Sequence, residues 1–132
     1  MPLALFIILS AATLGVTMGQ MAAGSRSSAI LLALNAQALF TADSGVQAAM
    51  HNLYFGADNR AAVDLNCEAI DGDMLNFTGQ GVAGCRVSLN CAVSVSASGD
   101  VSLYALESLS RCGSGDYLTA RRVRVWSSMK NN

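Results

Sequence analysis

Four cysteines, Cys67, Cys85, Cys91 and Cys112, are the residues of this 132-residue chain best suited to specific chemistry. Structural zinc sites usually show two close CxxC-type pairs or added histidines, whereas these cysteines are 18, 6 and 21 residues apart. Two disulfides formed in an oxidising compartment are therefore the better interpretation. We expect no bound metal and no cofactor.

Other residues that could do chemistry form no recognisable catalytic group. The single histidine, His51, lies on a predicted helix and is interpreted as a solvated residue near the helix end. The sequence shows no nucleophile–base pair, no paired carboxylates on a known motif and no phosphate loop. We therefore expect that the protein is not an enzyme. The net charge of −1 gives no argument for nucleic acid, and Arg121, Arg122 and Arg124 are interpreted as a solvated strand face.

The pairing of the cysteines depends on the turn of a predicted hairpin. If residues 98–99 form a two-residue turn, counting outwards places Cys85 opposite Cys112. Directly opposed residues on antiparallel strands approach to about 4.5–5.5 Å, which suits a disulfide. Cys67 would then pair with Cys91 and hold the preceding loop against the sheet.

A second pairing stays open because of two leucines. The two-residue turn places Leu103 and Leu109 on the outer face of the sheet, which is unfavourable for apolar side chains. A three-residue turn would bury them and move Cys112 away from Cys85. It would favour Cys67–Cys85 with Cys91–Cys112.

The elements that carry these cysteines follow a strand pattern. Residues 85–96 alternate strictly between apolar and polar side chains, which is typical of a half-buried strand. Predicted strands at 101–110 and 117–126 follow after glycine-containing turns, so 85–132 should form an antiparallel sheet. We expect its buried face to carry Val87, Leu89, Val93 and Val95.

The first part of the chain predicts one long helix. No Asp, Glu, Lys or Arg occurs before Arg26. About 20 apolar residues are enough to cross a bilayer core, so residues 1–25 are expected to form a transmembrane segment. Residues 26–56 should continue as an amphipathic helix, which ends near residue 53 and packs on the sheet. Its apolar stripe has seven-residue spacing: Leu32, Leu39, Val46 and Leu53.

Residues 57–84, between the helix and the strands, are rich in Gly, Asp and Asn and predict a connecting loop. A short helix near residues 61–65 is the one regular element expected there. The whole pattern predicts an α+β fold, in which a long N-terminal helix packs on a small antiparallel sheet. Any ligand recognition is expected in this loop.

Three residues of the predicted helix are candidate contacts with other chains. Gly15 and Gly19 have GxxxG spacing, which allows another helix to approach closely, although the glycines could equally loosen the helix locally. Asp43 interrupts the apolar stripe. It is either a contact with a neighbouring subunit or an exposed residue of the helix.

The order of long apolar helix, variable loop and disulfide-linked sheet resembles the type IV pilin superfamily over the whole chain. Residues 42–49 (Ala-Asp-Ser-Gly-Val-Gln-Ala-Ala) are similar to an alanine-rich segment of minor pilins. Cys112-Gly113 and residues 120–125 resemble the minor pilins of mannose-sensitive haemagglutinin pili. The resemblance implies a structural filament subunit whose partners are other pilins. It would sit in the inner membrane with a periplasmic C-terminal part before joining an extracellular filament.

Two positions depart from the family pattern. Mature pilins usually begin with Phe and carry Glu at the fifth position, where it is thought to pair with a neighbour's N-terminal amine. Met1 and Leu5 stand there in this sequence. A subunit without that glutamate needs no neighbour ahead of it, which implies a place at the filament tip or in initiation. Leader cleavage before Met1 is also implied by the resemblance, with an uncleaved anchor as the alternative.

A second class of function stays open beside the filament subunit. A single-pass membrane-anchored periplasmic binding protein would show the same apolar start and the same disulfides. A plain anchor, however, needs no apolar stripe beyond the membrane, so the amphipathic part of the helix favours the subunit. Filaments of this superfamily serve adhesion, motility, DNA uptake and secretion.

Overall fold

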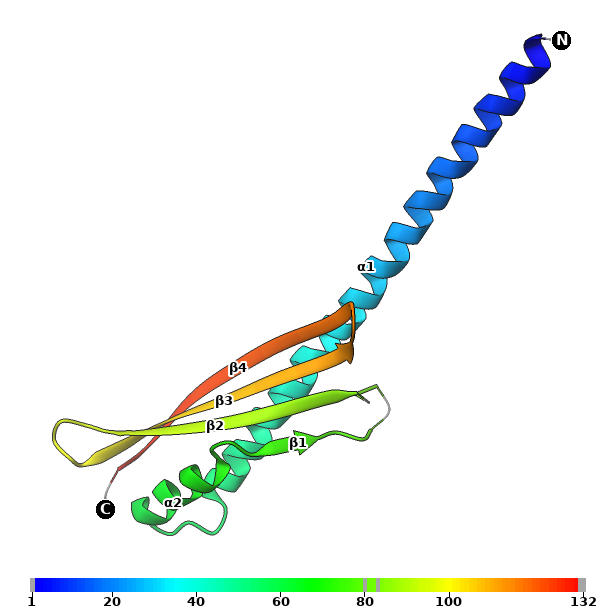
Figure 1. Ribbon diagram of the computed structural model, residues 1–132. Coiled ribbons are helices and arrows are strands. Elements are labelled where there is room, and N and C mark those ends of the chain that lie inside the picture. Colours follow the sequence, from blue (N-terminus) through cyan, green and yellow to red (C-terminus); the bar gives the residue numbers. More distant parts are fainter. Residues whose placement is uncertain (1, 80, 83, 131–132) are drawn as a thin grey trace. The chain divides into compact units, whose positions relative to one another are not determined.

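The structure is a computed structural model that describes residues 2–79, 81–82 and 84–130, without the side chains of residues 2–6, 8–11 and 14–26. Its elements in chain order are α1 (Pro2–Tyr54), α2 (Arg60–Ile70), β1 (Met74–Asn76), β2 (Cys85–Val95), β3 (Val101–Ser114) and β4 (Tyr117–Lys130) (Figure 1). The chain divides into two compact units, Met1–Ala33 and Leu34–Asn132.

The first unit consists of the N-terminal part of α1. The predicted transmembrane segment, residues 1–25, falls mostly on positions whose side chains are not described. Among the described residues, Ser27–Tyr54 is long and apolar enough to cross a membrane by length and composition. A core helix or a signal sequence passes the same test, so the apolar helix is compatible with a membrane anchor without defining a compartment.

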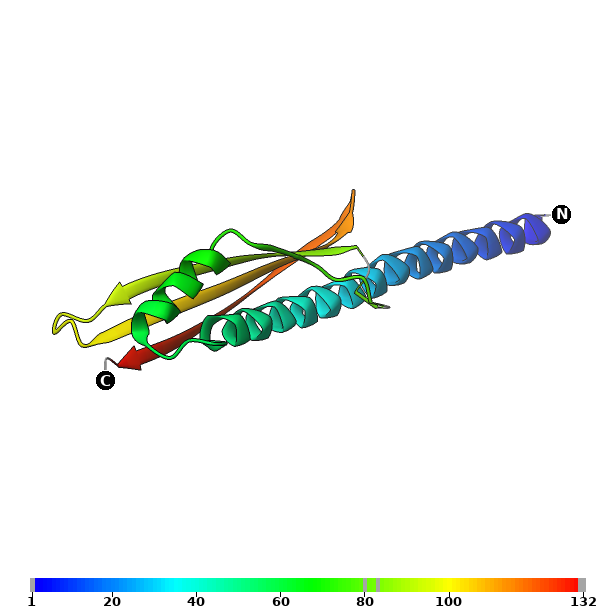
Figure 2. The ribbon, with the colours of Figure 1, turned by 90° about the horizontal axis from the view of Figure 1, so that it is seen from below.

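The second unit is a helix packed on an antiparallel sheet, which confirms the predicted α+β class. The sheet has the order β1-β2-β3-β4, and all three neighbouring pairs are antiparallel. The end of α1 and the short α2 lie on the same face of this sheet (Figures 1 and 2). The strand β4 forms one edge and the three-residue β1 forms the other.

Small residues let α1 approach the sheet closely. Ala38, Ala42 and Ala49 of α1 are buried against it. A Cβ atom built at Gly45 would lie 2.5 Å from the hydroxyl oxygen of Ser108 and 2.7 Å from a methyl carbon of Val87. Glycine at this position therefore sets the distance between the helix and the sheet.

The inner face of β3 combines small polar side chains with large apolar ones. Ser102, Ser108 and Ser110 are all buried, and Tyr104 and Leu106 complete the core between them. The outer face carries Leu103, which is 47 % exposed, and the half-buried Leu109. The placement of these two leucines is the one that the two-residue turn predicted.

The prediction for the buried face of β2 is correct for two of its four residues. Val87 and Leu89 are buried, but Val93 and Val95 are 41 % and 55 % exposed. The cause is the length of the hairpin, whose tip extends past α2 in both views (Figures 1 and 2). Beyond Cys91, every residue of β2 is exposed.

The predicted loop at 57–84 contains more regular structure than expected. The helix α2 runs well beyond the predicted 61–65, and the side chain of Asn59 accepts a hydrogen bond from the amide of Ala62 at its start. The strand β1 was not predicted. Its three residues pair with β2, so Leu75 lies opposite Val87.

Candidate functional site

The four cysteines form two disulfides, and none is free to bind a metal. Cys85 and Cys112 lie directly opposite each other on β2 and β3, with their Cα atoms 4.1 Å apart. Cys67 of α2 is joined to Cys91 of β2, with a Cα separation of 5.4 Å. This is the pairing that the two-residue turn predicted, and the alternative pairing is absent.

The strand register accounts for that pairing. Val93 faces Tyr104 and Cys91 faces Leu106, which is the register that counting outwards from residues 98–99 predicts. The connection itself is a longer loop than the predicted two-residue turn, because the amide of Ser96 donates to the carbonyl of Val101 and the amide of Gly99 donates to the carbonyl of Ser96. Gly99 has a φ of +77°, a left-handed conformation that glycine adopts without strain. The turn therefore sets the register of β2 and β3, and the register brings Cys85 to Cys112.

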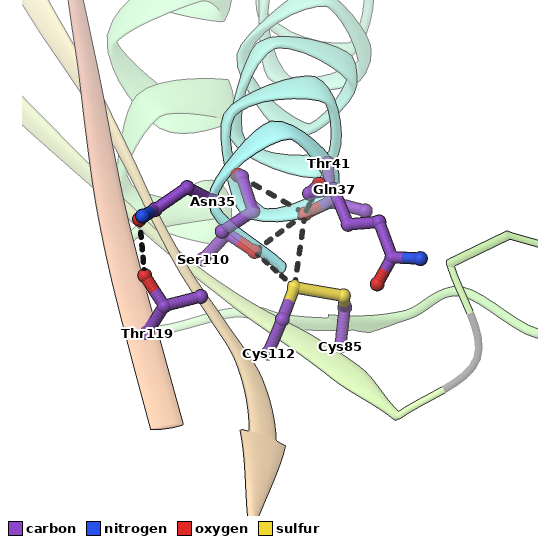
Figure 3. The surroundings of a disulfide bond; sticks show 8 residues. Asn35, Gln37, Thr41, Cys85, Ser110, Cys112 and Thr119 are labelled. Carbon is purple, nitrogen blue, oxygen red and sulfur yellow. Dashed lines mark hydrogen bonds between the residues drawn. A yellow bond between two sulfur atoms is a disulfide. The ribbon is translucent and has the colours of Figure 1, made fainter. Parts of the chain in front are cut away.

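A small polar cluster lies between α1 and the Cys85–Cys112 disulfide (Figure 3). The hydroxyl oxygen of Thr41, which is 1 % exposed, lies 2.8 Å from the carbonyl oxygen of Gln37 and 2.5 Å from the hydroxyl oxygen of Ser110. A hydroxyl has one hydrogen, so donation to Gln37 leaves Ser110 as the donor to Thr41. The same oxygen is 3.7 Å from the sulfur of Cys112.

The cluster extends to the edge of the sheet. Thr119 of β4 donates a hydrogen bond of 2.6 Å to the side-chain oxygen of Asn35, which comes from α1 (Figure 3). Bonds from one helix to β3 and to β4 fix its position along the sheet as well as its distance from it. We expect this polar cluster, together with the disulfide, to hold α1 in one register on the sheet.

A buried tyrosine joins α2 to the sheet. The hydroxyl of Tyr104 donates a hydrogen bond of 2.7 Å to the carboxylate of Asp64. Burial and this carboxylate together raise the pKa of Tyr104 to about 12, because each disfavours the phenolate. The tyrosine is therefore neutral at physiological pH and acts as a structural donor.

The face of α1 turned away from the core carries an exposed surface that is apolar except at its last residue. We call it the outer stripe: Ala36, Leu39, Phe40 and Asp43. Leu39 is 53 % exposed and Phe40 is 68 % exposed. These residues and Val123 of β4 line a shallow hollow of about 420 Å³. Their i, i+3, i+4, i+7 spacing places the four residues of the stripe on one side of the helix.

Asp43, the predicted contact with a neighbouring subunit, lies at the end of the outer stripe. It is exposed, and its carboxylate accepts a hydrogen bond of 2.8 Å from the side-chain amide of Gln47. The surface is therefore apolar over one turn of the helix and polar over the next. Exposure agrees with both interpretations of Asp43, so its contact with a neighbouring subunit stays a prediction.

The seven-residue stripe predicted on the helix divides between two environments. Val46 and Leu53 are buried in the core, whereas Leu39 is exposed, and so is Leu32 in the first unit. An α-helix drifts by about 20° for every seven residues, so such a stripe winds slowly around it. A sheet can therefore cover only part of the stripe, which here is Val46 and Leu53, while Leu32 and Leu39 stay exposed.

The other candidates are placed as follows. Met1 lies outside the described residues, as do the surroundings of Leu5, Gly15 and Gly19, so the expectations on them stay predictions. His51 is exposed and stacks on the ring of Phe55, with the ring centroids 5.0 Å apart.

The three arginines of the predicted solvated strand face are all exposed, but Arg121 lies on the other side of β4 from Arg122 and Arg124, because side chains alternate along a strand. Arg122 forms an ion pair of 3.1 Å with Glu107 of β3, and Arg124 contacts the same carboxylate. Within the described part of the chain, no three metal-binding side chains come together.

Sequence reasoning missed Phe40 and the Thr41–Ser110 contact. The spacing of Ala36 and Phe40 places them on one side of the helix but does not tell whether that side is buried or exposed. A single buried hydroxyl pair leaves no comparable signal. Comparison of the chain with models of known protein families, with curated proteins and with solved structures found no match.

Proposed function

We propose that this chain is a structural subunit of a filament of the type IV pilus kind, a minor pilin or pseudopilin. In this proposal α1 packs against the helices of neighbouring subunits. The observation that carries the proposal is the outer stripe, an exposed apolar surface on a helix that already has a separate buried face.

The outer stripe is difficult to explain if the protein acts alone. A helix that only covers its own sheet needs one apolar face, and the face of Ala38, Ala42 and Ala49 fulfils that role. Phe40 is instead left largely in solvent. Burying apolar surface stabilises an assembly by roughly 25 cal/mol per Å², and exposed apolar patches often mark interfaces.

A filament subunit of this kind is held first in the inner membrane and later in a filament outside the cell, and the disulfides and the apolar helix support both locations. Disulfides form and persist in a periplasm or outside the cell. An apolar N-terminal helix would hold the subunit in the inner membrane until it joins the filament. Its partners are then other pilin subunits, and the outer stripe is the surface they would contact.

The test is a pair of surface substitutions. Phe40→Ser changes the outer stripe, and Phe55→Ser changes an equally exposed aromatic residue, 72 % exposed, just beyond the end of α1. Quantitative mass spectrometry of sheared filaments would measure how much of each variant is incorporated. We expect Phe40→Ser to reduce incorporation several-fold and Phe55→Ser to leave it unchanged, with both variants equally abundant in the membrane fraction.

Two results would count against the proposal. Equal incorporation of both variants would remove the outer stripe as a subunit contact. Absence of the unaltered protein from every filament fraction, while it remains abundant in the membrane, would favour the membrane-anchored binding protein instead.

A further inference from the structure

Two arginines face each other on the outer side of the sheet, away from the helices. Arg86 of β2 and Arg111 of β3 are directly opposed in the strand register, and both are exposed. Like charges in this arrangement destabilise a sheet. No carboxylate pairs with either arginine within the described residues. The sequence thus places a repulsive pair where a neutral or opposite pair would be more stable.

The same two arginines line an open hollow of about 630 Å³. The lining also includes Asn76, Phe77 and Leu118, and no Asp or Glu is among the described residues that form it. The site therefore combines two guanidinium groups, a neutral hydrogen-bonding group and an apolar wall. Such a composition is complementary to an anion that is attached to a less polar group.

The nearest acid on these strands is already engaged. Glu107 is the only acidic residue within β2, β3 and β4, and it pairs with Arg122 and Arg124 of β4. It is four residues from Arg111 along β3 and does not line the hollow. Glu107 therefore does not neutralise the charge of Arg86 or Arg111.

We propose that this hollow binds a phosphate or sulfate group. A guanidinium donates two parallel N–H bonds to two oxygens, so a carboxylate, with two oxygens, saturates one arginine. A tetrahedral oxyanion offers oxygens to both arginines at once. Phe77 and Leu118 would contact the group that carries the oxyanion if it is an ester. This inference goes beyond the filament function and does not depend on it.

A bound oxyanion would turn the two arginines from a pair that destabilises the folded chain into a pair that stabilises it. Without it, each arginine repels the other, and replacing one with glutamine removes that repulsion. With it, both arginines stabilise the folded chain through the ligand, which binds the folded state only. A pair of ordinary solvated arginines would show no such reversal.

The experiment measures thermal unfolding of the full chain in a non-ionic detergent at constant ionic strength. The probes are sodium phosphate, glucose 6-phosphate and glucose 6-sulfate, with sodium chloride as the reference. The variants are Arg86→Gln and Arg111→Gln. Lys130→Gln is the control because it removes the same charge from the far end of the same face. Arg111→Lys keeps the charge but loses the planar fork, and serves if a glutamine variant does not fold.

We expect Tm to rise with phosphate or with the esters in the unaltered chain and in Lys130→Gln. The rise should be lost in both glutamine variants and reduced in Arg111→Lys. In sodium chloride alone, the glutamine variants should unfold at the same or a higher temperature than the unaltered chain. A larger rise with the esters than with phosphate would identify an esterified ligand, and an equal rise would identify the free ion.

Two outcomes would overturn the proposal. One is the absence of any rise in the unaltered chain. The other is an equal rise in all variants, since phosphate and sulfate salts stabilise proteins generally by exclusion from their surface. Titration calorimetry with glucose 6-sulfate on the unaltered chain and on Arg111→Gln provides a second reading, in which equal heats would contradict the site.

Discussion

At the scale of single residues, two buried serines of β3 differ in their partners. Ser110 shares a hydrogen bond with Thr41, whereas the hydroxyl of Ser108 has no partner within the described chain. Ser110→Ala should lower the free energy of unfolding by about 1 kcal/mol, because it removes a bond between buried groups. Ser108→Ala should leave it unchanged or raise it slightly. Urea unfolding followed by circular dichroism compares the two; equal losses would contradict this account.

Tyr104 makes the stability of the fold depend on alkaline pH. Its folded pKa of about 12 lies above the ordinary value of 10.0, so the folded state holds its proton more tightly than the unfolded state. The stabilisation is complete below pH 10 and is lost as the pH rises towards 12. Above pH 10, the unaltered chain should therefore lose stability more steeply than Tyr104→Phe. Urea midpoints at a series of pH values measure the slopes, and Tyr117→Phe, at an exposed position, is the control.

At the scale of elements, the contact between α1 and the sheet depends on the missing side chain of Gly45. Alanine would favour the helix by about 1 kcal/mol, but its Cβ would overlap Ser108 and Val87, and overpacking costs about 1–3 kcal/mol. We expect Gly45→Ala to destabilise the fold. Adding Ser108→Ala should recover part of the loss. Urea unfolding of the single and double variants tests this, and an increase in stability for Gly45→Ala alone would refute it.

The elements could be predicted from the sequence where the alternation of apolar and polar residues was long and unbroken. Strict alternation located β2, and the hairpin turn then determined both the register and the pairing of Cys85 with Cys112. Alternation does not reveal what covers a strand, so Val93 and Val95 were wrongly placed in the core. The strand β1 was missed because three residues are too few to show a period, and its pairing depends on β2.

At the scale of the whole molecule, the two disulfides should determine whether the second unit is folded. Each closes a loop of 24 or 27 residues and contributes about 3–4 kcal/mol in the chain-entropy model. Together they contribute about 6–8 kcal/mol, which is comparable to the whole free energy of unfolding of a typical domain, about 5–15 kcal/mol. A thiol reductant at neutral pH should therefore abolish cooperative unfolding of the full chain.

Variants that lack one disulfide show whether the two disulfides stabilise the fold additively. Cys67→Ala/Cys91→Ala and Cys85→Ala/Cys112→Ala should each stay folded but unfold at lower urea concentration than the unaltered chain. Circular dichroism before and after reduction gives the comparison. Unchanged cooperativity in the reductant would mean that the core of α1 and the sheet is sufficient alone.

The candidate interface could be predicted less completely than the disulfides. Asp43 was singled out because it interrupts an apolar stripe, and it is exposed at the end of the outer stripe. Phe40 was not singled out, because an apolar residue on a helix is equally consistent with burial. Only the position of the sheet distinguishes the two faces, and that position depends on contacts between residues far apart in the sequence.

The two disulfides also limit how far this chain can be stretched. The loops they close overlap, since Cys85 lies between Cys67 and Cys91. A pull applied beyond both ends of this region would pass across one sulfur bridge, back through the 5 residues between Cys91 and Cys85, and across the other. The segment from Cys67 to Cys112 is 45 backbone steps long, but it then bears tension as a link of 6 steps, whether or not the sheet is intact. With an extended residue spanning about 3.5 Å, well over 100 Å of slack is withheld. Under load, this part of the protein therefore behaves as a nearly inextensible tie.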